Sequence, residues 1–318
     1  MNYPSSIHLT EVGLRDGIQN EPKILTLEEK KELIDALLQA GVKDLEVGSY
    51  VNPKAVPQMA NTAELVAELP VLDDVRYRAL WLNARGLDQA VAAGKLHLEG
   101  NLIVTASEAF VQRNQNRNID QVIAEMPEWI ERYVAAGVAP DGIGVMAAFG
   151  CNFEGDIAPQ KVIELLARVA ELLPEGQAGL KRVILADTMG WGTPKRTRAL
   201  IEGIRNRWPT VKLKMHLHDT RGTAMSNTIA AMELGVREFD TAVGGLGGCP
   251  FAGHKGAAGN VSTEDLVFMC NEMGIETGID LDRLLVATAL AERLVGHPVS
   301  SKVYTGGTRA RFAEAKAA

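Results

Sequence analysis

The chain has 318 residues, of which 46% are hydrophobic and 23% are charged, and its formal net charge is −7. This balance is ordinary for a globular protein and argues against a general nucleic-acid surface. The first residues lack the basic and apolar regions of a signal peptide, and no apolar run approaches the roughly 18 residues of a membrane span. Three scattered cysteines exclude a disulfide framework. We therefore expect a cytoplasmic protein that binds neither nucleic acid nor a membrane.

Short apolar and β-branched segments alternate with amphipathic helical segments along the chain. The first helix is expected over 26–41, because Thr26 can cap it, Glu29 can complete a capping box and Gly41 can end it. The expected strands cover 7–14, 44–50, 75–82, 96–105, 142–149, 180–187, 211–218 and 239–245. Further helices are expected over 158–173, 193–208, 223–236, 263–275 and 280–296.

Eight strand-then-helix units predict a parallel sheet, and eight is the number that closes a TIM (β/α)8 barrel. We expect the barrel over about 6–275 and extra C-terminal helices over about 276–318, within one catalytic domain of 1–318. An open doubly wound sheet is the alternative, but no GxGxxG follows the first strand.

In such a barrel, catalytic groups lie at the C-terminal ends of the strands. The stretch "HLHD" ends the seventh strand, and His216 and His218 project from one face because they are two residues apart. With Asp16 after the first strand, they could hold a divalent cation. The spacing leaves Mg²⁺, Mn²⁺, Zn²⁺ and Co²⁺ open, and two surface histidines on an ordinary strand are the alternative.

Six motifs occur in order along the chain: "EVGLRDGIQNE", "EVGSYVNPKAVPQM", "TASEAFVQRNQNRN", "ADTMGWGTP", "HLHDT" and "GGLGGCPFA…GNVSTEDLVFM". Together they closely resemble the hydroxymethylglutaryl-CoA (HMG-CoA) lyase family, within a wider group of metal-dependent barrel lyases and synthases. The glycine-rich "GGLGGCP" stretch is specific to the lyase branch.

The resemblance implies a role for each of several active-site residues. It implies that Asp16, His216, His218 and Asn260 bind a divalent cation, Mg²⁺ or Mn²⁺, and that Arg15 stabilises an enolate. It implies that Glu46 and Asp187 are acidic residues of the active-site mouth, and that Asp16 or His216 removes a proton. Cys249 matches the thiol of a mobile loop and would protonate the enolate. Asn114 and Asn116, on an expected loop after the fourth strand, are candidate substrate-binding residues.

The implied reaction is the cleavage of (S)-3-hydroxy-3-methylglutaryl-CoA to acetyl-CoA and acetoacetate, with no organic cofactor beyond the CoA thioester. The family's usual setting is leucine degradation, and a homodimer or larger homo-oligomer is expected. One departure from the family pattern matters: Gly253–Lys255 enlarges the glycine-rich loop. A second, Asn152 where the family often has proline, is minor. Because the loop could change the acyl group, a lyase of citramalyl-CoA stays open. So do, more remotely, a condensing synthase and a non-catalytic scaffold.

Overall fold

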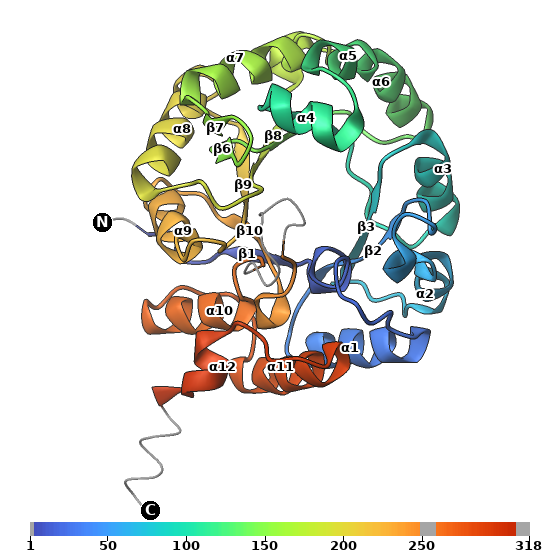
Figure 1. Ribbon diagram of the computed structural model, residues 1–318, viewed down its shortest axis with the longest axis vertical. Helices are drawn as coiled ribbons and strands as arrows, with labels where there is room; N and C mark the ends of the chain where they lie inside the picture. Colours follow the sequence, from blue (N-terminus) through green and yellow to red (C-terminus); the bar gives the residue numbers. More distant parts are fainter. Residues whose placement is uncertain (1–2, 249–258, 310–318) are drawn as a thin grey trace, which may run out of the picture. The chain divides into compact units, whose positions relative to one another are not determined.

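The computed structural model describes residues 3–248 and 259–309, which fall into two compact units. We call Ser5–His97, Asp240–Gly248 and the described part of Ala258–Ala318 the terminal unit, and Leu98–Phe239 the central unit. Figure 1 follows the chain through both by colour. The expectation of one domain over 1–318 stays a prediction.

The terminal unit pairs its strands side by side in the order β3, β2, β1, β10, with parallel registers between β1 and β2 and between β2 and β3. Its strands are β1 (His8–Glu11), β2 (Asp44–Tyr50), β3 (Arg76–Trp81) and β10 (Glu238–Thr241), of which β10 begins in the central unit. Its α-helices are α1 (Leu27–Gln39), α2 (Thr62–Glu68), α3 (Ala84–Ala93), α10 (Thr263–Glu272), α11 (Leu281–Val295) and α12 (Lys302–Gly306). Short helical turns cover Gly13–Gly17, Pro57–Met59 and Val243–Gly245.

Helix α1 begins and ends as predicted. The Thr26 hydroxyl accepts a hydrogen bond from the Glu29 amide, the Glu29 carboxylate accepts one from the Thr26 amide, and Gly41 adopts a φ of +94° just beyond the helix. Its apolar face packs against α11, as Figure 1 shows for the blue and orange-red helices. Helices α11 and α12 are the predicted C-terminal helices.

The central unit pairs its strands in the order β9, β8, β5, β4, all parallel. The strands are β4 (Asn101–Thr105), β5 (Gly142–Met146), β8 (Arg182–Asp187) and β9 (Lys212–Leu217). The helices are α4 (Glu108–Gln115), α5 (Ile119–Ala124), α6 (Met126–Ala135), α7 (Pro159–Ala170), α8 (Pro194–Arg207) and α9 (Ala224–Glu233), with a short turn at Gly176–Gly179. Among the described residues of either unit, no helix has the length and hydropathy needed to cross a membrane.

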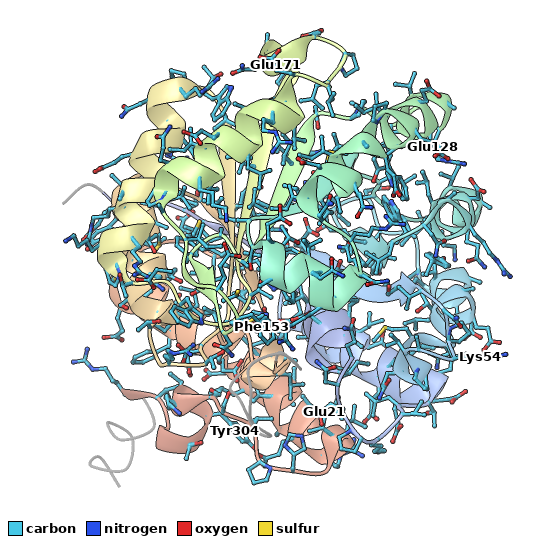
Figure 2. All side chains as sticks on the ribbon, turned by 45° about the horizontal axis from the view of Figure 1, so that its top comes forward. Glu21, Lys54, Glu128, Phe153, Glu171 and Tyr304 are labelled. Atoms are coloured by element: carbon cyan, nitrogen blue, oxygen red, sulfur yellow. The ribbon has the colours of Figure 1, made fainter. Side chains whose placement is uncertain are left out.

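A small antiparallel hairpin interrupts the strand-helix alternation of the central unit. It consists of β6 (Gly150–Cys151) and β7 (Gly155–Asp156), and Phe153, labelled in Figure 2, lies between them. The Phe153 ring stacks on Phe110 of α4 with their centroids 6.4 Å apart. The hairpin therefore packs against α4.

Seven of the eight predicted strands are shorter in the structure, and three of them differ most. The first ends at Glu11 because a π-helical turn, Gly13–Gly17, follows it. The fourth begins at Asn101, whereas we expected it to begin at residue 96. The eighth ends at Thr241, because Gly244 and Gly245 adopt φ values of +68° and +65° that a strand does not allow. Gly244 and Gly245 form a turn that the apolar pattern alone did not reveal.

Candidate active site

The π-helical turn after β1 carries Arg15 and Asp16. Its first amide, at Gly13, donates a hydrogen bond of 2.7 Å to the Glu11 carboxyl. A Cβ atom at position 13 would lie only 2.5 Å from that carboxyl oxygen, so only glycine fits without a shift. The turn is thus fixed by the residue that ends the strand.

Arg15 lies between two carboxylates of the terminal unit. Its Nε donates to Glu46 Oε2 at 2.6 Å and its Nη1 donates to Asp16 Oδ1 at 2.7 Å. All three side chains are largely buried. Burial favours the neutral guanidinium, but the charges of Glu46 and Asp16 raise the pKa of Arg15 above its ordinary value. The result is a permanent cation in a defined position, suited to stabilising an oxyanion.

Asn260 completes this half of the site. Its Nδ2 donates to Asp16 Oδ2 at 2.6 Å and more weakly to the Leu246 carbonyl at 3.3 Å. Its Oδ1 is buried and has no hydrogen-bond partner among the described residues. A buried amide oxygen normally has a partner. An amide oxygen beside a carboxylate is also a donor set that hard divalent cations bind.

Glu11, the last residue of β1, was not among the predicted site residues, but it organises the backbone around them. Its Oε1 accepts from the amides of Gly13 and Val243 at 2.7 and 2.9 Å, and its Oε2 accepts from Thr263 Oγ1 at 2.6 Å. Burial raises the pKa of this carboxyl to about 7. Through these hydrogen bonds, Glu11 connects the segment that carries Arg15 with the segments that carry Leu246 and Asn260.

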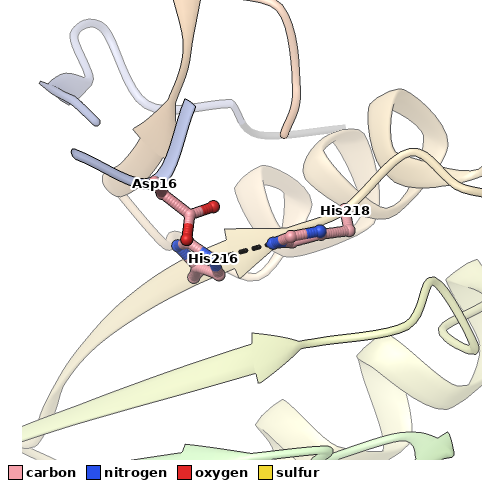
Figure 3. A group of neighbouring side chains, drawn as sticks. All are labelled: Asp16, His216 and His218. Carbon is pink, nitrogen blue, oxygen red and sulfur yellow. Dashed lines mark hydrogen bonds between the residues drawn. The ribbon is translucent and has the colours of Figure 1, made fainter. Parts of the chain in front are cut away.

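The central unit contributes two histidines at the end of β9. Figure 3 shows His216 and His218 side by side, with their Nε2 atoms 3.1 Å apart. Their ring centroids are 5.1 Å apart, and His218 is only 5% exposed. The prediction that both project from one face of the strand is confirmed. Two imidazole nitrogens that converge on one point are typical of a transition-metal or mixed nitrogen–oxygen site.

Asp187 ends β8 and is fully buried. Its two carboxylate oxygens accept from the amides of Trp191 and Gly192 at 2.7 and 2.8 Å. Burial raises its pKa, although these amides and the charge of His218 oppose the rise. The carboxyl thus anchors the turn after β8, and its direct part in the chemistry stays a prediction.

Asn114 is not on a loop, so that expectation is wrong for Asn114, whereas Asn116 lies in the segment between α4 and α5, as expected. Asn114 lies within α4, and Asn116 is its left-handed C-cap with a φ of 54°. Both are exposed, and Asn116 Oδ1 accepts from Gln112 Nε2 at 2.9 Å. Ser107 caps α4 by accepting from the Phe110 amide, a start signal that the sequence reading overlooked. Their role in substrate binding stays a prediction.

Cys249 and the enlarged loop Gly253–Lys255 lie outside the described residues. The other two thiols are buried. Cys151 Sγ lies 3.0 Å from Ser107 Oγ, and burial raises the pKa of Cys270 in α10 to about 12. Both thiols are therefore part of the packed interior, where thiols are typically unreactive.

Asn152, a departure from the family pattern, connects two large side chains of the central unit. Its Oδ1 accepts from Trp191 Nε1 at 2.8 Å and from Arg221 Nη2 at 3.2 Å. The Arg221 guanidinium lies 5.1 Å over the Trp191 ring and donates to the Met189 carbonyl at 2.6 Å. A proline at position 152 could not accept these side-chain bonds. The departure is therefore part of the local architecture near the ends of β8 and β9.

Residues 6–290 match the family model described as HMGL-like. The chain belongs to this family. It is 38% identical over 301 residues to the mitochondrial hydroxymethylglutaryl-CoA lyase of Bos taurus, covering 95% of this chain and 89% of that protein. It is also 36% identical over 312 residues to the (R)-citramalyl-CoA lyase of Chloroflexus aurantiacus, covering 95% of each.

A solved structure has the same fold. It is an HMG-CoA lyase from Acinetobacter baumannii in complex with coenzyme A and 3-methylmalate, with a TM-score of 0.85 and 35% identity over 97% of this chain and 98% of that chain. The predicted family and the predicted (β/α)8 barrel with C-terminal helices are therefore confirmed.

Proposed function

We propose that this protein is a carbon–carbon lyase that cleaves (S)-3-hydroxy-3-methylglutaryl-CoA to acetyl-CoA and acetoacetate. The observation that carries the proposal is the Arg15–Asp16 turn, with its guanidinium held by two carboxylates and with the buried Asn260 Oδ1 beside it, which has no partner among the described residues. Family membership over nearly the whole chain supports it. The reaction needs both features, an oxyanion-stabilising cation and oxygen ligands for a metal.

We propose that Asp16, His216, His218 and Asn260 hold one divalent cation, Mg²⁺ or Mn²⁺ (Figure 3). The donor set fits, because it combines a carboxylate, a buried amide oxygen that lacks a hydrogen-bond partner within 3–248 and 259–309, and two imidazole nitrogens. When bound, such a cation acts as a Lewis acid that lowers the pKa of the substrate's C3 hydroxyl.

Each step of the reaction is assigned to a particular side chain. Asp16 or His216 accepts the C3 hydroxyl proton as the C2–C3 bond breaks and C3 becomes the ketone carbon of acetoacetate. The bonding electrons form the acetyl-CoA enolate, and Arg15 stabilises its oxygen. Cys249 donates a proton to C2 and recovers one from solvent, since an ordinary thiol is largely protonated at neutral pH.

An assay with two substrates tests the proposal. Purified protein is incubated with HMG-CoA or (R)-citramalyl-CoA in the presence of Mg²⁺, Mn²⁺ or EDTA, and acetoacetate and pyruvate are measured separately. We expect acetoacetate from HMG-CoA, formed with either metal and abolished by EDTA. Turnover that EDTA leaves unchanged would contradict the metal assignment, and the absence of acetoacetate would contradict the substrate.

Citramalyl-CoA is the second candidate substrate. It is favoured by the 36% identical relative named for that activity, which covers 95% of both chains. The enlarged loop Gly253–Lys255 is a further reason to test it. In the same assay this activity gives pyruvate in place of acetoacetate.

We also propose a cytoplasmic location, a role in leucine degradation, and assembly into a homodimer or larger homo-oligomer. Light scattering on the purified protein measures the last of these directly.

A further inference from the structure

The loop between α11 and α12, residues 296–301, contacts the Val243–Gly245 turn that follows β10. The Ser300 amide donates to the Gly244 carbonyl at 3.0 Å. The Ser300 hydroxyl lies 3.2 Å from that carbonyl and 3.3 Å from the Gly245 carbonyl, and it can donate to either. Ser300 therefore binds the backbone of two glycines that are 56 and 55 residues away in the sequence.

This close approach requires glycine in the turn. A Cβ atom at Gly244 would lie 2.8 Å from the Val299 side chain, and one at Gly245 would lie 2.4 Å from Ser300 Oγ. Glycine has more backbone freedom than any other residue, and here two glycines are adjacent. The conformation of the turn therefore depends on contacts from other segments of the terminal unit.

Those contacts are of two kinds. The amides of Val243 and Gly244 donate to the carboxyl groups of Glu11 and Glu264, at 2.9 and 3.0 Å. Ser300 instead donates to the carbonyls of the turn. The buried acids and Ser300 thus restrain different backbone groups of one turn.

The residues just after the turn hold Asn260. The Leu246 carbonyl accepts from the Asn260 amide at 3.1 Å and from its Nδ2 at 3.3 Å, and Nδ2 also donates to Asp16 Oδ2 at 2.6 Å. A Cβ atom at Gly259 would lie 2.6 Å from the Gly245 carbonyl oxygen, so the two segments are packed backbone to backbone. Hydrogen bonds at each end of the Gly245–Leu246 segment therefore connect Ser300 with the Asp16–Asn260 pair.

The loop that carries Ser300 is itself held by two helices. The Val299 amide donates to the Glu292 carboxylate of α11 at 3.1 Å, and the Ser301 hydroxyl donates to the Asp265 carboxylate of α10 at 2.9 Å. Figure 1 shows α10, α11 and α12 packed together, and α10 contacts both of the others. Because the loop is fixed on both sides of Ser300, its hydroxyl can restrain the glycine turn.

We propose that Ser300 is a positioning residue of the proposed metal site. It restrains the Gly244–Gly245 backbone so that the Leu246 carbonyl holds the Asn260 side chain beside Asp16. The inference rests on the proposed function, which makes Asp16 and Asn260 ligands of one cation. Residues that orient a metal ligand through hydrogen bonds change the affinity for the metal when they are replaced.

Mn²⁺ binding tests the proposal, measured on the purified full chain from the electron paramagnetic resonance signal of free Mn²⁺. We expect Ser300→Ala to bind Mn²⁺ about fivefold to tenfold more weakly, because it loses the hydroxyl donor and keeps the amide. Ser300→Thr retains a hydroxyl at this exposed position and should bind Mn²⁺ as the wild type does. In the lyase assay, Ser300→Ala should need more Mn²⁺ for half-maximal activity by the same factor, and saturating Mn²⁺ should restore kcat.

Ser301→Ala is the matched control, because it removes the neighbouring hydroxyl, which binds Asp265 and caps α12. It should lower the melting temperature and leave the Mn²⁺ affinity unchanged. Unchanged Mn²⁺ affinity in folded Ser300→Ala, or an equal loss of affinity in Ser301→Ala, overturns the inference and leaves the proposed lyase intact. A wild type that binds no Mn²⁺ overturns the proposed metal site and this inference together.

Discussion

The two units supply very different halves of the proposed site. In the terminal unit, Arg15, Asp16, Glu46 and Asn260 form a continuous chain of hydrogen bonds between 2.6 and 2.7 Å. In the central unit, the Nε2 atoms of His216 and His218 lie 3.1 Å apart and contact each other. The hydrogen bonds of the terminal half surround the Arg15 charge. The central half consists of two imidazoles, which can bind a metal ion only through unprotonated nitrogens.

The difference indicates a division of labour. A guanidinium fixed by two carboxylates needs no reorganisation when an oxyanion develops, which is the property that makes electrostatic stabilisation effective. Two neighbouring imidazoles gain most from a ligand that takes both lone pairs, because only one proton can lie between their Nε2 atoms. We therefore expect substitutions in the two halves to have distinguishable signatures.

His218→Ala should have the largest effect. It removes one proposed ligand from the central half, so both metal binding and turnover should be lost, with kcat/KM falling by roughly a thousandfold or more. Metal content after dialysis and the acetoacetate assay measure the two effects. A variant that stays folded by circular dichroism and keeps more than a tenth of its activity would contradict the ligand assignment.

Cys249→Ser separates the chemistry from the metal site. The hydroxyl is a much weaker acid than the thiol, so kcat should fall by about a hundredfold to a thousandfold. Metal content should match that of the wild type, unlike the His218→Ala variant. Full activity in Cys249→Ser would remove this residue from the proposed mechanism.

Arg15→Lys tests the half of the proposed site that lies in the terminal unit. Lysine keeps the charge but cannot donate from two directions to Glu46 and Asp16, so the cation loses its fixed position. We expect kcat to fall about a hundredfold with KM and metal content little changed. Steady-state kinetics beside metal analysis measures this. A change confined to KM would mean that Arg15 binds the substrate without stabilising the transition state.

Local sequence patterns predicted much of the architecture. The capping box of α1, the strand of each β-α unit and the shared face of His216 and His218 follow from residue types a few positions apart. The closeness of Asp16 and Asn260, 244 residues apart, came from the family resemblance and not from any local pattern.

The interactions missed by the sequence reading are those between distant segments. Glu11 bonds to Val243 and Thr263, which are 232 and 252 residues away, so nothing beside it in the sequence indicates its role. Asn152 looked like a minor change because its partners Trp191 and Arg221 are 39 and 69 residues away. A buried acid at a strand end followed by glycine is the one signal that could have drawn attention to Glu11.

The smallest expected effect concerns stability and its dependence on pH. Burial raises the pKa values of Glu11 and of Glu264, whose carboxylate accepts from the Gly244 amide, to about 7. The folded state therefore favours the protonated carboxyls. Their contribution to the free energy of unfolding is complete below the ordinary value of 4.5 and is lost as pH rises through about 7.

Glu11→Gln should flatten this dependence. The amide oxygen can still accept from Gly13 and Val243, and the new NH2 group can donate to the Thr263 hydroxyl where the protonated acid would. Between pH 5.5 and 8 the wild type should lose about 2 kcal/mol of its free energy of unfolding at this carboxyl, a loss that the variant avoids. Urea unfolding at both pH values measures it, with Glu68→Gln on the exposed face of α2 as the control. Equal pH dependences of the free energy of unfolding for the wild type and Glu11→Gln would mean that Glu11 is ionised in the folded protein. The Gly13–Gly17 turn would then have a buried charge at Glu11 in addition to the charges of Arg15 and Asp16.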